Sequence, residues 1–284
     1  MRILVTGANG FVGQRLCKNL KEGGHEVLQF DVEQGDITEI PEPNGHLDHI
    51  FHLAARTFVP ESWKNPYEFY KTNTLGTEAI LEICRIKNCS LTYISSYVYG
   101  LPEQLPINEL HPVKPNTPYN HSKLLGEELC RFYNQHFKVN VTVLRPFNIY
   151  GYGQSQHFLI PTILGQILNP ALQEVTIQNL TPKRDYLYID DFINCIMSTL
   201  GLNGFKIYNV GSGKSYSVGE IIQIIQDITG LNKMIIETGE RRNNEINDVV
   251  ADISLIKSEI SWEPKLKFRE GLELIVRSLM EGKH

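Results

Sequence analysis

Apolar runs and stretches of helical spacing alternate through the first half of the chain. The apolar runs predict short strands at 2–6, 26–30, 49–53, 91–95 and 141–145. Between them, apolar residues recur with the period of a helix at 11–23, 66–88 and 119–138. This alternation indicates βαβ units and a parallel sheet with helices on both faces. We therefore predict an α/β fold of the doubly wound kind over residues 1–150.

The pattern changes after Gly151. Candidate helices lie at 158–168, 190–200, 217–229 and 268–281, and shorter candidate strands lie near 174–178, 206–210 and 234–237. We predict a smaller mixed part over 151–284, with a return to the first sheet near 185–211. A cluster of prolines predicts an irregular loop over 100–118, just ahead of a helix.

Composition limits the class of protein. Hydrophobic residues make up 42% and charged residues 21% of the 284 positions, as in ordinary soluble proteins. No run approaches the roughly 20 apolar residues that span a bilayer, and Arg2 leads directly into an apolar strand, so we expect a cytoplasmic protein. A net charge of −5 argues against a nucleic-acid surface. Five scattered cysteines without a close pair indicate buried thiols, and we expect no metal site.

A glycine-rich turn follows the first strand, in Thr6-Gly7-Ala8-Asn9-Gly10-Phe11-Val12-Gly13. The three glycines suit a tight turn, a close approach of the backbone to a pyrophosphate, and close helix packing. The helix that follows offers free N–H groups to phosphate oxygens. The second strand ends at Asp31, where a carboxylate accepts hydrogen bonds from an adenosine ribose. Together these features are typical of a Rossmann-type dinucleotide site.

The residues at the end of the second strand bear on the choice of cofactor. A carboxylate at Asp31 would repel a 2′-phosphate, and neither Val32 nor Glu33 offers a cation to offset it. The sequence therefore favours NAD(H), with NADP(H) as the alternative. Without a cofactor, the same residues would form an ordinary strand-to-helix turn and a solvated carboxylate.

A second motif lies at the start of the helix over 119–138. Thr117 is suited to cap this helix, and Pro118 to its first turn. Tyr119 and Lys123 are then one turn apart on one face. A lysine ammonium and the positive end of the helix dipole would lower the pKa of the phenol toward the range of a proton shuttle. Such a pair can move a proton on and off a sugar oxygen while a hydride moves at carbon, although this spacing is also common by chance.

A hydroxyl group is expected to complete the catalytic set. The strand 91–95 runs into Ser95-Ser96-Tyr97-Val98-Tyr99-Gly100, and either serine could hydrogen bond the substrate oxygen. A glycine turn, a pair of serines and a Tyr–Lys pair in this order are far rarer by chance than any one of them.

At this point the chain resembles the extended short-chain dehydrogenase/reductases that act on nucleotide sugars, the NAD-dependent epimerase/dehydratase family. The resemblance runs from end to end. It is carried by residues 6–13, 35–37, 52–55, 73–77, 95–100, 119–123, 144–151, 184–186 with 189–191, and 208–213. It implies a cofactor-binding part over 1–150, a part over 151–284 that mainly binds a nucleotide sugar, and a homodimer formed through helices equivalent to 66–88 and 119–138.

The resemblance also implies roles for single residues. Ser95, three residues before the Val-Tyr-Gly, matches the catalytic hydroxyl, and Ser96 is the weaker candidate. Tyr119 and Lys123 complete the set, and Lys123 would also bind the nicotinamide ribose. The expected cofactor contacts are Gly7, Asn9, Gly10, Phe11, Val12, Gly13, Asp31, Asp36, Ile37, Leu53, Ala54, Ala55, Asn73, Tyr119, Lys123 and Pro146. The expected substrate contacts are Ser95, Ser96, Asn148, Arg184 and Arg242, although the sequence after Arg242 departs from the family pattern.

The family runs three chemistries on one scaffold, so the fold alone does not choose among them. In the 4,6-dehydratases an Asp-Glu pair follows the catalytic hydroxyl, and here those positions hold Ser96 and Tyr97, which argues against dehydration. The stretches 59–63, 95–100, 147–155 and 179–185 are similar to GDP-4-keto-6-deoxymannose reductases. We predict reduction of the C4 ketone of an NDP-4-keto-6-deoxy sugar, GDP-linked by preference. The alternatives are an NAD-dependent NDP-sugar 4-epimerase and, more remotely, a regulatory protein that binds the cofactor without catalysis.

Overall fold

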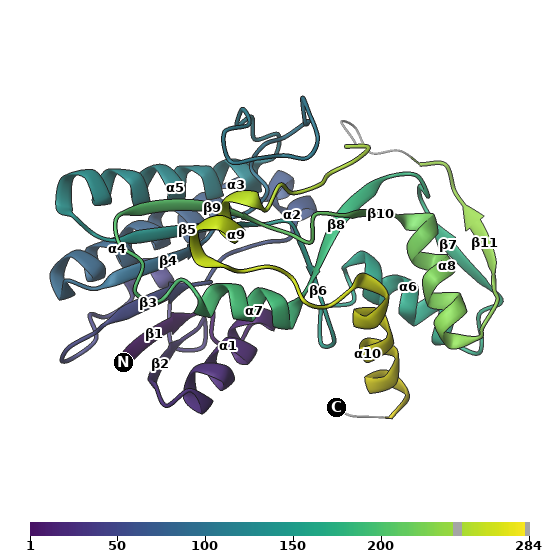
Figure 1. Ribbon diagram of the computed structural model, residues 1–284, viewed down its shortest axis with the longest axis horizontal. Coiled ribbons are helices and arrows are strands. Elements are labelled where there is room, and N and C mark those ends of the chain that lie inside the picture. Colours follow the sequence, from purple (N-terminus) through teal and green to yellow (C-terminus); the bar gives the residue numbers. More distant parts are fainter. Residues whose placement is uncertain (241–245, 282–284) are drawn as a thin grey trace.

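The computed structural model describes residues 1–240 and 246–281 and is built on a six-stranded parallel sheet (Figure 1). Its strands are β1 (Arg2–Thr6), β2 (Glu26–Phe30), β3 (His49–His52), β4 (Ser90–Ile94), β5 (Val141–Pro146) and β9 (Phe205–Val210). Their spatial order is β2-β1-β3-β4-β5-β9. The five strands predicted in the first half are confirmed, and the sixth comes from the second half of the chain.

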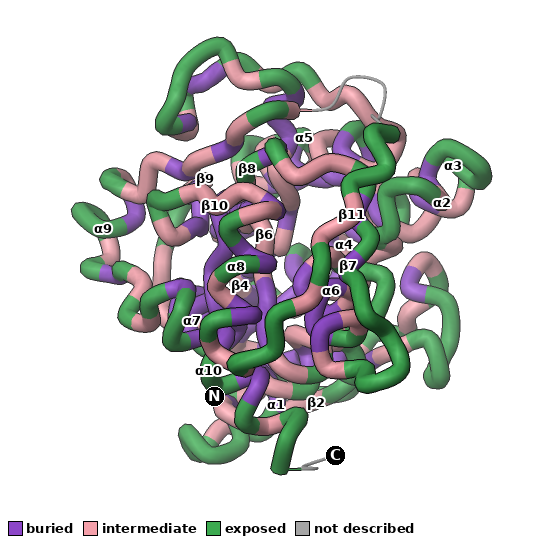
Figure 2. The backbone as a smooth tube through the Cα atoms, turned by 90° about the vertical axis from the view of Figure 1, so that its right-hand side faces the viewer, coloured by how far each residue is buried: buried purple, intermediate pink, exposed green. Residues whose placement is uncertain are grey.

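Helices cover both faces of this sheet. On one face lie α4 (Gly76–Lys87) and α5 (Pro118–Phe137), and on the other lie α1 (Phe11–Glu22) and α7 (Ile189–Met197) (Figure 1). The core divides in the same way, because side chains alternate along a strand. Ile3 and Val5 of β1 belong to one buried cluster, and Leu4 between them belongs to the other. Figure 2 shows buried segments running through the middle of the molecule. The predicted doubly wound α/β fold is confirmed.

The strand order reverses between β1 and β3. The chain leaves β1 through α1 toward β2, then crosses back to β3 on the other side of β1. In open parallel sheets, ligands bind in the crevice outside the carboxyl ends of the strands at such a reversal. The fold therefore directs attention to the loops that follow β1 and β3.

The segment 66–88 is not the single helix that its spacing predicts. It divides into α3 (Pro66–Tyr70), the π-helical turn η2 (Lys71–Leu75) and α4, and two shorter helices precede it, η1 (Ile37–Glu39) and α2 (Val59–Lys64). A π turn interrupts the regular ladder of a helix and is frequent at functional sites. The interruption falls at Asn73, whose side chain is fully buried and bonded to other segments.

The second half of the chain adds two small sheets beside the first. One contains β6 (Asn148–Tyr150), β8 (Lys183–Tyr188) and β10 (Ser215–Ser217), and the other contains β7 (Glu174–Ile177) and β11 (Met234–Glu237). Four helices accompany them, α6 (Leu159–Leu168), α8 (Val218–Thr229), α9 (Ser254–Ile260) and α10 (Phe268–Met280). The prediction missed β6, β10 and α9, because three-residue strands and a seven-residue helix are too short to show a period. Within the described ranges, no helix is long and apolar enough to cross a membrane.

Candidate active site

The glycine turn after β1 packs tightly against its neighbours. Gly7 has a φ of +68°, and a Cβ there would lie 2.8 Å from the main-chain nitrogen of Ala54. A Cβ on Gly13 would lie 2.1 Å from the carbonyl oxygen of Gly7. No side chain in the described part of the chain caps α1 at Gly10, so the first N–H groups of this helix are left for another acceptor. A pyrophosphate fits this turn, because it needs both a close backbone and free helical N–H groups.

Two carboxylates lie at the end of β2 beside the glycine turn. The main-chain N–H of Asn9 donates to Asp31 Oδ2 at 2.7 Å, and the Asn9 amide donates to Glu33 Oε2 at 3.2 Å. Asp31 therefore holds the turn and keeps acceptor capacity for a ribose hydroxyl. The two acids also make the edge of the groove negative, which disfavours a 2′-phosphate.

The remaining expected cofactor contacts lie around the same crevice. The main-chain N–H groups of Leu53 and Ala54 donate to the backbone and hydroxyl oxygens of Thr6, each at 3.2 Å, so the loop after β3 is tied to β1. Asp36 pairs with Lys71 at 2.6 Å, and hydrogen bonds from Lys71 and from Thr38 lower the pKa of its carboxyl to about 2. Ile37 is buried in the core under α4, so its side chain supports the crevice from below.

The helix α5 begins as the sequence predicts. The hydroxyl of Thr117 accepts a hydrogen bond from the main-chain N–H of Asn120 at 3.0 Å, and Pro118 is in the first turn. Tyr119 follows at once, and its ring packs edge-on against Phe69 of α3 with 6.3 Å between centroids. Lys123, one turn later, is only 1% exposed, and its Nζ lies 4.3 Å from the centre of the Tyr93 ring.

Burial dominates the charge states of this pair. It raises the pKa of the Tyr119 phenol above its ordinary value, opposed by a hydrogen bond from Ser96. Burial also lowers the pKa of Lys123 to about 7, opposed by the nearby Cys130 and Glu127. We expected the lysine to lower the pKa of the phenol, but this pKa is raised, because burial is the largest influence on it and only the Ser96 hydroxyl opposes the rise. Tyr119 is therefore held in its protonated form.

The two serines at the end of β4 have separate roles in the structure. We expected Ser95 to face the tyrosine, but the hydroxyl that bonds the Tyr119 phenol belongs to Ser96. Ser95 is 3% exposed and donates to Glu127 Oε1 at 2.5 Å. Both serines follow Ile94, the last residue of β4, so the alternation of the strand does not decide which hydroxyl reaches Tyr119.

Asn73 links the loop after β3 to the start of α5. Its Oδ1 accepts from the main-chain N–H of Arg56 at 2.8 Å, and its Nδ2 donates to Ser122 Oγ at 2.9 Å. The Ser122 hydroxyl in turn donates to the carbonyl of Tyr119 at 2.7 Å. Asn73 thus lies beside the catalytic set as expected, and it fixes the first turn of α5 relative to the crevice.

The other three expected substrate contacts, after the two serines, lie in the second half of the chain. Asn148 of β6 donates to the carbonyl of Asp185 at 3.1 Å, and Arg184 of β8 donates to the carbonyl of Ile246 at 2.7 Å. Burial raises the pKa values of Tyr97 and Tyr186, and the positive charge of Arg184 opposes both rises, which places this cation near the residues after β4. Arg242 lies outside the described residues.

The comparisons with known proteins agree with this geometry. The profile of the NAD dependent epimerase/dehydratase family matches residues 3–211. The chain belongs to this family. The relationship inferred from the motifs is thereby confirmed, and the family is NAD-dependent by its description.

Individual members of the NAD dependent epimerase/dehydratase family differ in reaction and ligand. GDP-6-deoxy-D-mannose reductase of Pseudomonas aeruginosa is 30% identical over 97% of this chain and 96% of its own length. The structure of RMD from Pseudomonas aeruginosa complexed with NADPH superposes with a TM-score of 0.89 and 29% identity, covering 99% of both chains. UDP-glucose 4-epimerase of Thermotoga maritima with UDP-glucose superposes with a TM-score of 0.91 and 25% identity over 100% of both chains.

Sequence reasoning gave no role to two charged residues of the site. Glu127 and Arg145 are buried against each other, with Arg145 Nη2 2.5 Å from Glu127 Oε2. Their positions offered a signal, because Glu127 follows Lys123 by one helical turn and Arg145 is the one charged residue of a buried strand. A charge at a buried position calls for a partner.

The carboxylates beside the glycine turn lead to a test of cofactor preference. We expect the protein to bind NADH at least about tenfold more tightly than NADPH, because Asp31 and Glu33 repel a 2′-phosphate. The double substitution Asp31→Ala and Glu33→Arg is expected to reverse this order. Fluorescence titration with each cofactor measures both affinities, and Glu39→Ala, which removes a carboxylate of η1, is the control. Tighter binding of NADPH by the unaltered protein would contradict the interpretation.

Proposed function

We propose that the protein reduces the C4 ketone of an NDP-4-keto-6-deoxy sugar, GDP-linked by preference, with hydride from NADH. The observation that carries the proposal is the Tyr119 phenol in hydrogen-bond contact with Ser96 at the first turn of α5, one turn before Lys123. Reduction of a ketone needs a protonated donor beside the carbonyl oxygen. The likeness to GDP-6-deoxy-D-mannose reductase over 97% of the chain supports the same reaction class.

The residues at the crevice fit the cofactor. The glycine turn and the first N–H groups of α1 would hold the pyrophosphate, Asp31 the adenosine ribose, and Lys123 the nicotinamide ribose. When bound, NADH supplies the hydride. This part of the proposal assigns residues 1–150 to the cofactor and 151–284 mainly to the substrate.

The chain's own residues manage the proton. Tyr119 donates its proton to O4 of the sugar as the ketone is reduced, and the hydroxyl that bonds the phenol, Ser96, holds O4 in place. Lys123 then stabilises the phenolate from one turn along α5. Asn148, Arg184 and Arg242 would hold the nucleotide diphosphate, with Arg184 supplying positive charge near the end of β4.

Dehydration is a poor fit to these residues. The Tyr97 hydroxyl donates to the carbonyl of Gly100 at 2.5 Å, and burial raises the pKa of this phenol above its ordinary value. The two positions after Ser95, where the dehydratases carry their Asp-Glu pair, hold Ser96 and Tyr97, and neither residue has a carboxylate. An NDP-sugar 4-epimerase is the second candidate, supported by the TM-score of 0.91 to UDP-glucose 4-epimerase.

Turnover with a keto sugar distinguishes the two candidates. The purified protein given NADH and a GDP-4-keto-6-deoxy sugar should consume NADH in proportion to product, and Tyr119→Phe should lower the rate by about a hundredfold or more while NADH still binds. Absorbance of NADH follows the reaction. Interconversion of UDP-glucose and UDP-galactose without added cofactor, together with no consumption of NADH, would replace the reductase by the epimerase.

The two serines give a matched pair of variants. Ser96→Ala should lower kcat by about a hundredfold, because it removes the donor that holds O4. Ser95→Ala should lower kcat by no more than about tenfold, because Ser95 is turned toward Glu127 and acts only at a distance. Steady-state kinetics of both variants show which substitution lowers kcat more. A larger loss in Ser95→Ala than in Ser96→Ala would indicate that Ser95 contacts the substrate.

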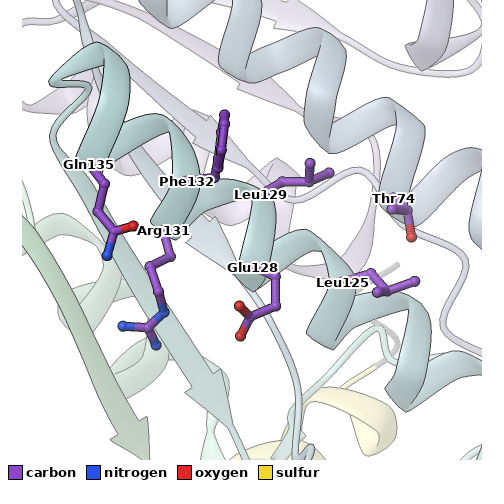
Figure 3. A pocket seen from close by; sticks show the side chains of 7 residues that line it. All are labelled: Thr74, Leu125, Glu128, Leu129, Arg131, Phe132 and Gln135. Atoms are coloured by element: carbon purple, nitrogen blue, oxygen red, sulfur yellow. The ribbon is translucent and has the colours of Figure 1, made fainter.

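We also propose that the protein forms a homodimer through the outer faces of η2, α4 and α5. A hollow of about 430 Å³ lies on this side of α5. Figure 3 shows the side chains that line it, which are Thr74, Leu125, Glu128, Leu129, Arg131, Phe132 and Gln135. Exposed apolar side chains surround it, with Leu75 55% and Phe132 50% exposed. Continuous exposed apolar surface is typical of an association surface.

The mass in solution tests the dimer. Light scattering should give about twice the 32.4 kDa of one chain, and the double substitution Leu129→Glu and Phe132→Glu should halve the mass, because it places charge in the apolar face. Leu110→Glu, at a leucine that is 93% exposed in the loop before α5, is the control and should leave the dimer intact. A single-chain mass for the unaltered protein would contradict this assembly.

A further inference from the structure

A continuous chain of buried polar side chains lies behind the catalytic residues. It consists of Ser95, Glu127, Arg145, Tyr99 and Asn209, and each of them is at most 3% exposed. The proposed reaction gives none of these residues a contact with substrate or cofactor. We call them the Glu127 network.

The links of the Glu127 network are short and directional. Glu127 Oε1 accepts from Ser95 Oγ at 2.5 Å and from Arg145 Nε at 3.0 Å, and Glu127 Oε2 accepts from Arg145 Nη2 at 2.5 Å. Arg145 Nη1 donates to the Tyr99 hydroxyl at 2.9 Å, and this hydroxyl donates to Asn209 Oδ1 at 2.6 Å. Asn209 then donates to the carbonyl of Ile107 at 2.9 Å.

The network joins the elements that carry the catalytic residues. At one end, Ser95 lies next to Ser96 at the end of β4, and Glu127 lies one turn after Lys123 on α5. At the other end, Asn209 of β9 holds the loop over 100–117 through Ile107. Tyr99 lies between them, three residues after Ser96. The network therefore fixes the chain on both sides of Ser96.

The hydrogen bonds of the sheet backbone reach Ser95 but do not fix the orientation of Ser96. The main-chain N–H of Ser95 donates to the carbonyl of Leu144 at 2.8 Å, so Ser95 is still aligned with β5. Ser96 lies one residue farther, where the chain leaves the sheet. The bond from the Ser95 hydroxyl to Glu127 limits rotation at this point, because the carboxylate is itself held by Arg145.

A buried ion pair adds little net stability compared with an apolar replacement of the same shape. Its hydrogen bonds are directional, however, and a site must hold its reacting groups within about half an ångström. We propose that Ser95, Glu127, Arg145 and Tyr99 are positioning residues that set Ser96 against Tyr119. This inference rests on the role that the proposed function gives to Ser96.

The test is a double-mutant cycle between Ser95 and Ser96. Ser95→Ala removes only the hydrogen bond to Glu127 and should lower kcat by about tenfold, with KM for both substrates within about twofold. In a Ser96→Ala background the same change should alter kcat by less than about twofold, because the group that it positions is gone. Ser95→Thr, which keeps the hydroxyl, should restore most of the loss.

Tyr99→Phe provides a second route to the same result. It removes the hydroxyl between Arg145 and Asn209 and keeps the ring, and it should lower kcat in the unaltered protein but not in the Ser96→Ala background. Thr199→Val is the control, because the Thr199 hydroxyl bonds Thr92 of β4 at 2.6 Å, away from the catalytic residues. Circular dichroism and NADH titration confirm that each variant is folded before its kcat is compared.

The outcomes separate the two proposals. If Ser95→Ala and Ser96→Ala both lower kcat and their effects multiply in the double variant, the positioning role is overturned and the proposed function stands. If Ser96→Ala leaves kcat unchanged, the role that the proposed function gives to Ser96 is wrong, and the inference that rests on it is overturned as well. Loss of thermal stability in Ser95→Ala and Tyr99→Phe without any change in kcat would make the network merely structural and would also overturn the inference.

Discussion

The close approach of three backbone segments at the carboxyl end of β1 is the constraint on which the crevice depends. Gly7 lies against Ala54 of the loop after β3, and Gly13 in the first turn of α1 lies against Gly7. A methyl group at either glycine would meet main-chain atoms, which cannot move aside as the end of a side chain can. This contact brings the start of α1 to the point where the strand order reverses. The free helical N–H groups and the acids at the end of β2 therefore face one groove.

The end of β4 shows how one strand serves both the core and the chemistry. Two adjacent serines follow Ile94, the last residue of β4, and their side chains have different partners. Ser95 points into the core beneath α5, where Glu127 satisfies it. Ser96 comes where the strand gives way to a loop, and it reaches Tyr119. Ser95 thus makes its hydrogen bond in the interior of the protein, and Ser96 makes its hydrogen bond in the site.

The sequence predicted what depends on local pattern. Apolar runs located the strands of the main sheet, and Thr117 with Pro118 located the start of α5. What it did not predict depends on distant contacts. The π turn at Asn73 follows from bonds to Arg56 and to Ser122, which are remote in the sequence. The hydroxyl that bonds Tyr119 belongs to Ser96, and no local pattern distinguishes it from Ser95, because both serines follow the end of β4 and their partners are remote in the sequence.

The charge state of the tyrosine follows from how charge is arranged behind it. Lys123 is buried one turn before Glu127, and the cost of burying its ammonium exceeds the stabilisation that Cys130 and Glu127 give it. A weakly stabilised ammonium does little to ionise a buried phenol, and Tyr119 stays protonated. A reductase begins its cycle with this form, because it must give a proton, whereas an epimerase that begins with oxidised cofactor must first take one. Since Ser, Tyr and Lys are common to both enzymes, the direction in which Tyr119 moves its proton follows from the form of the cofactor that is bound when the sugar arrives.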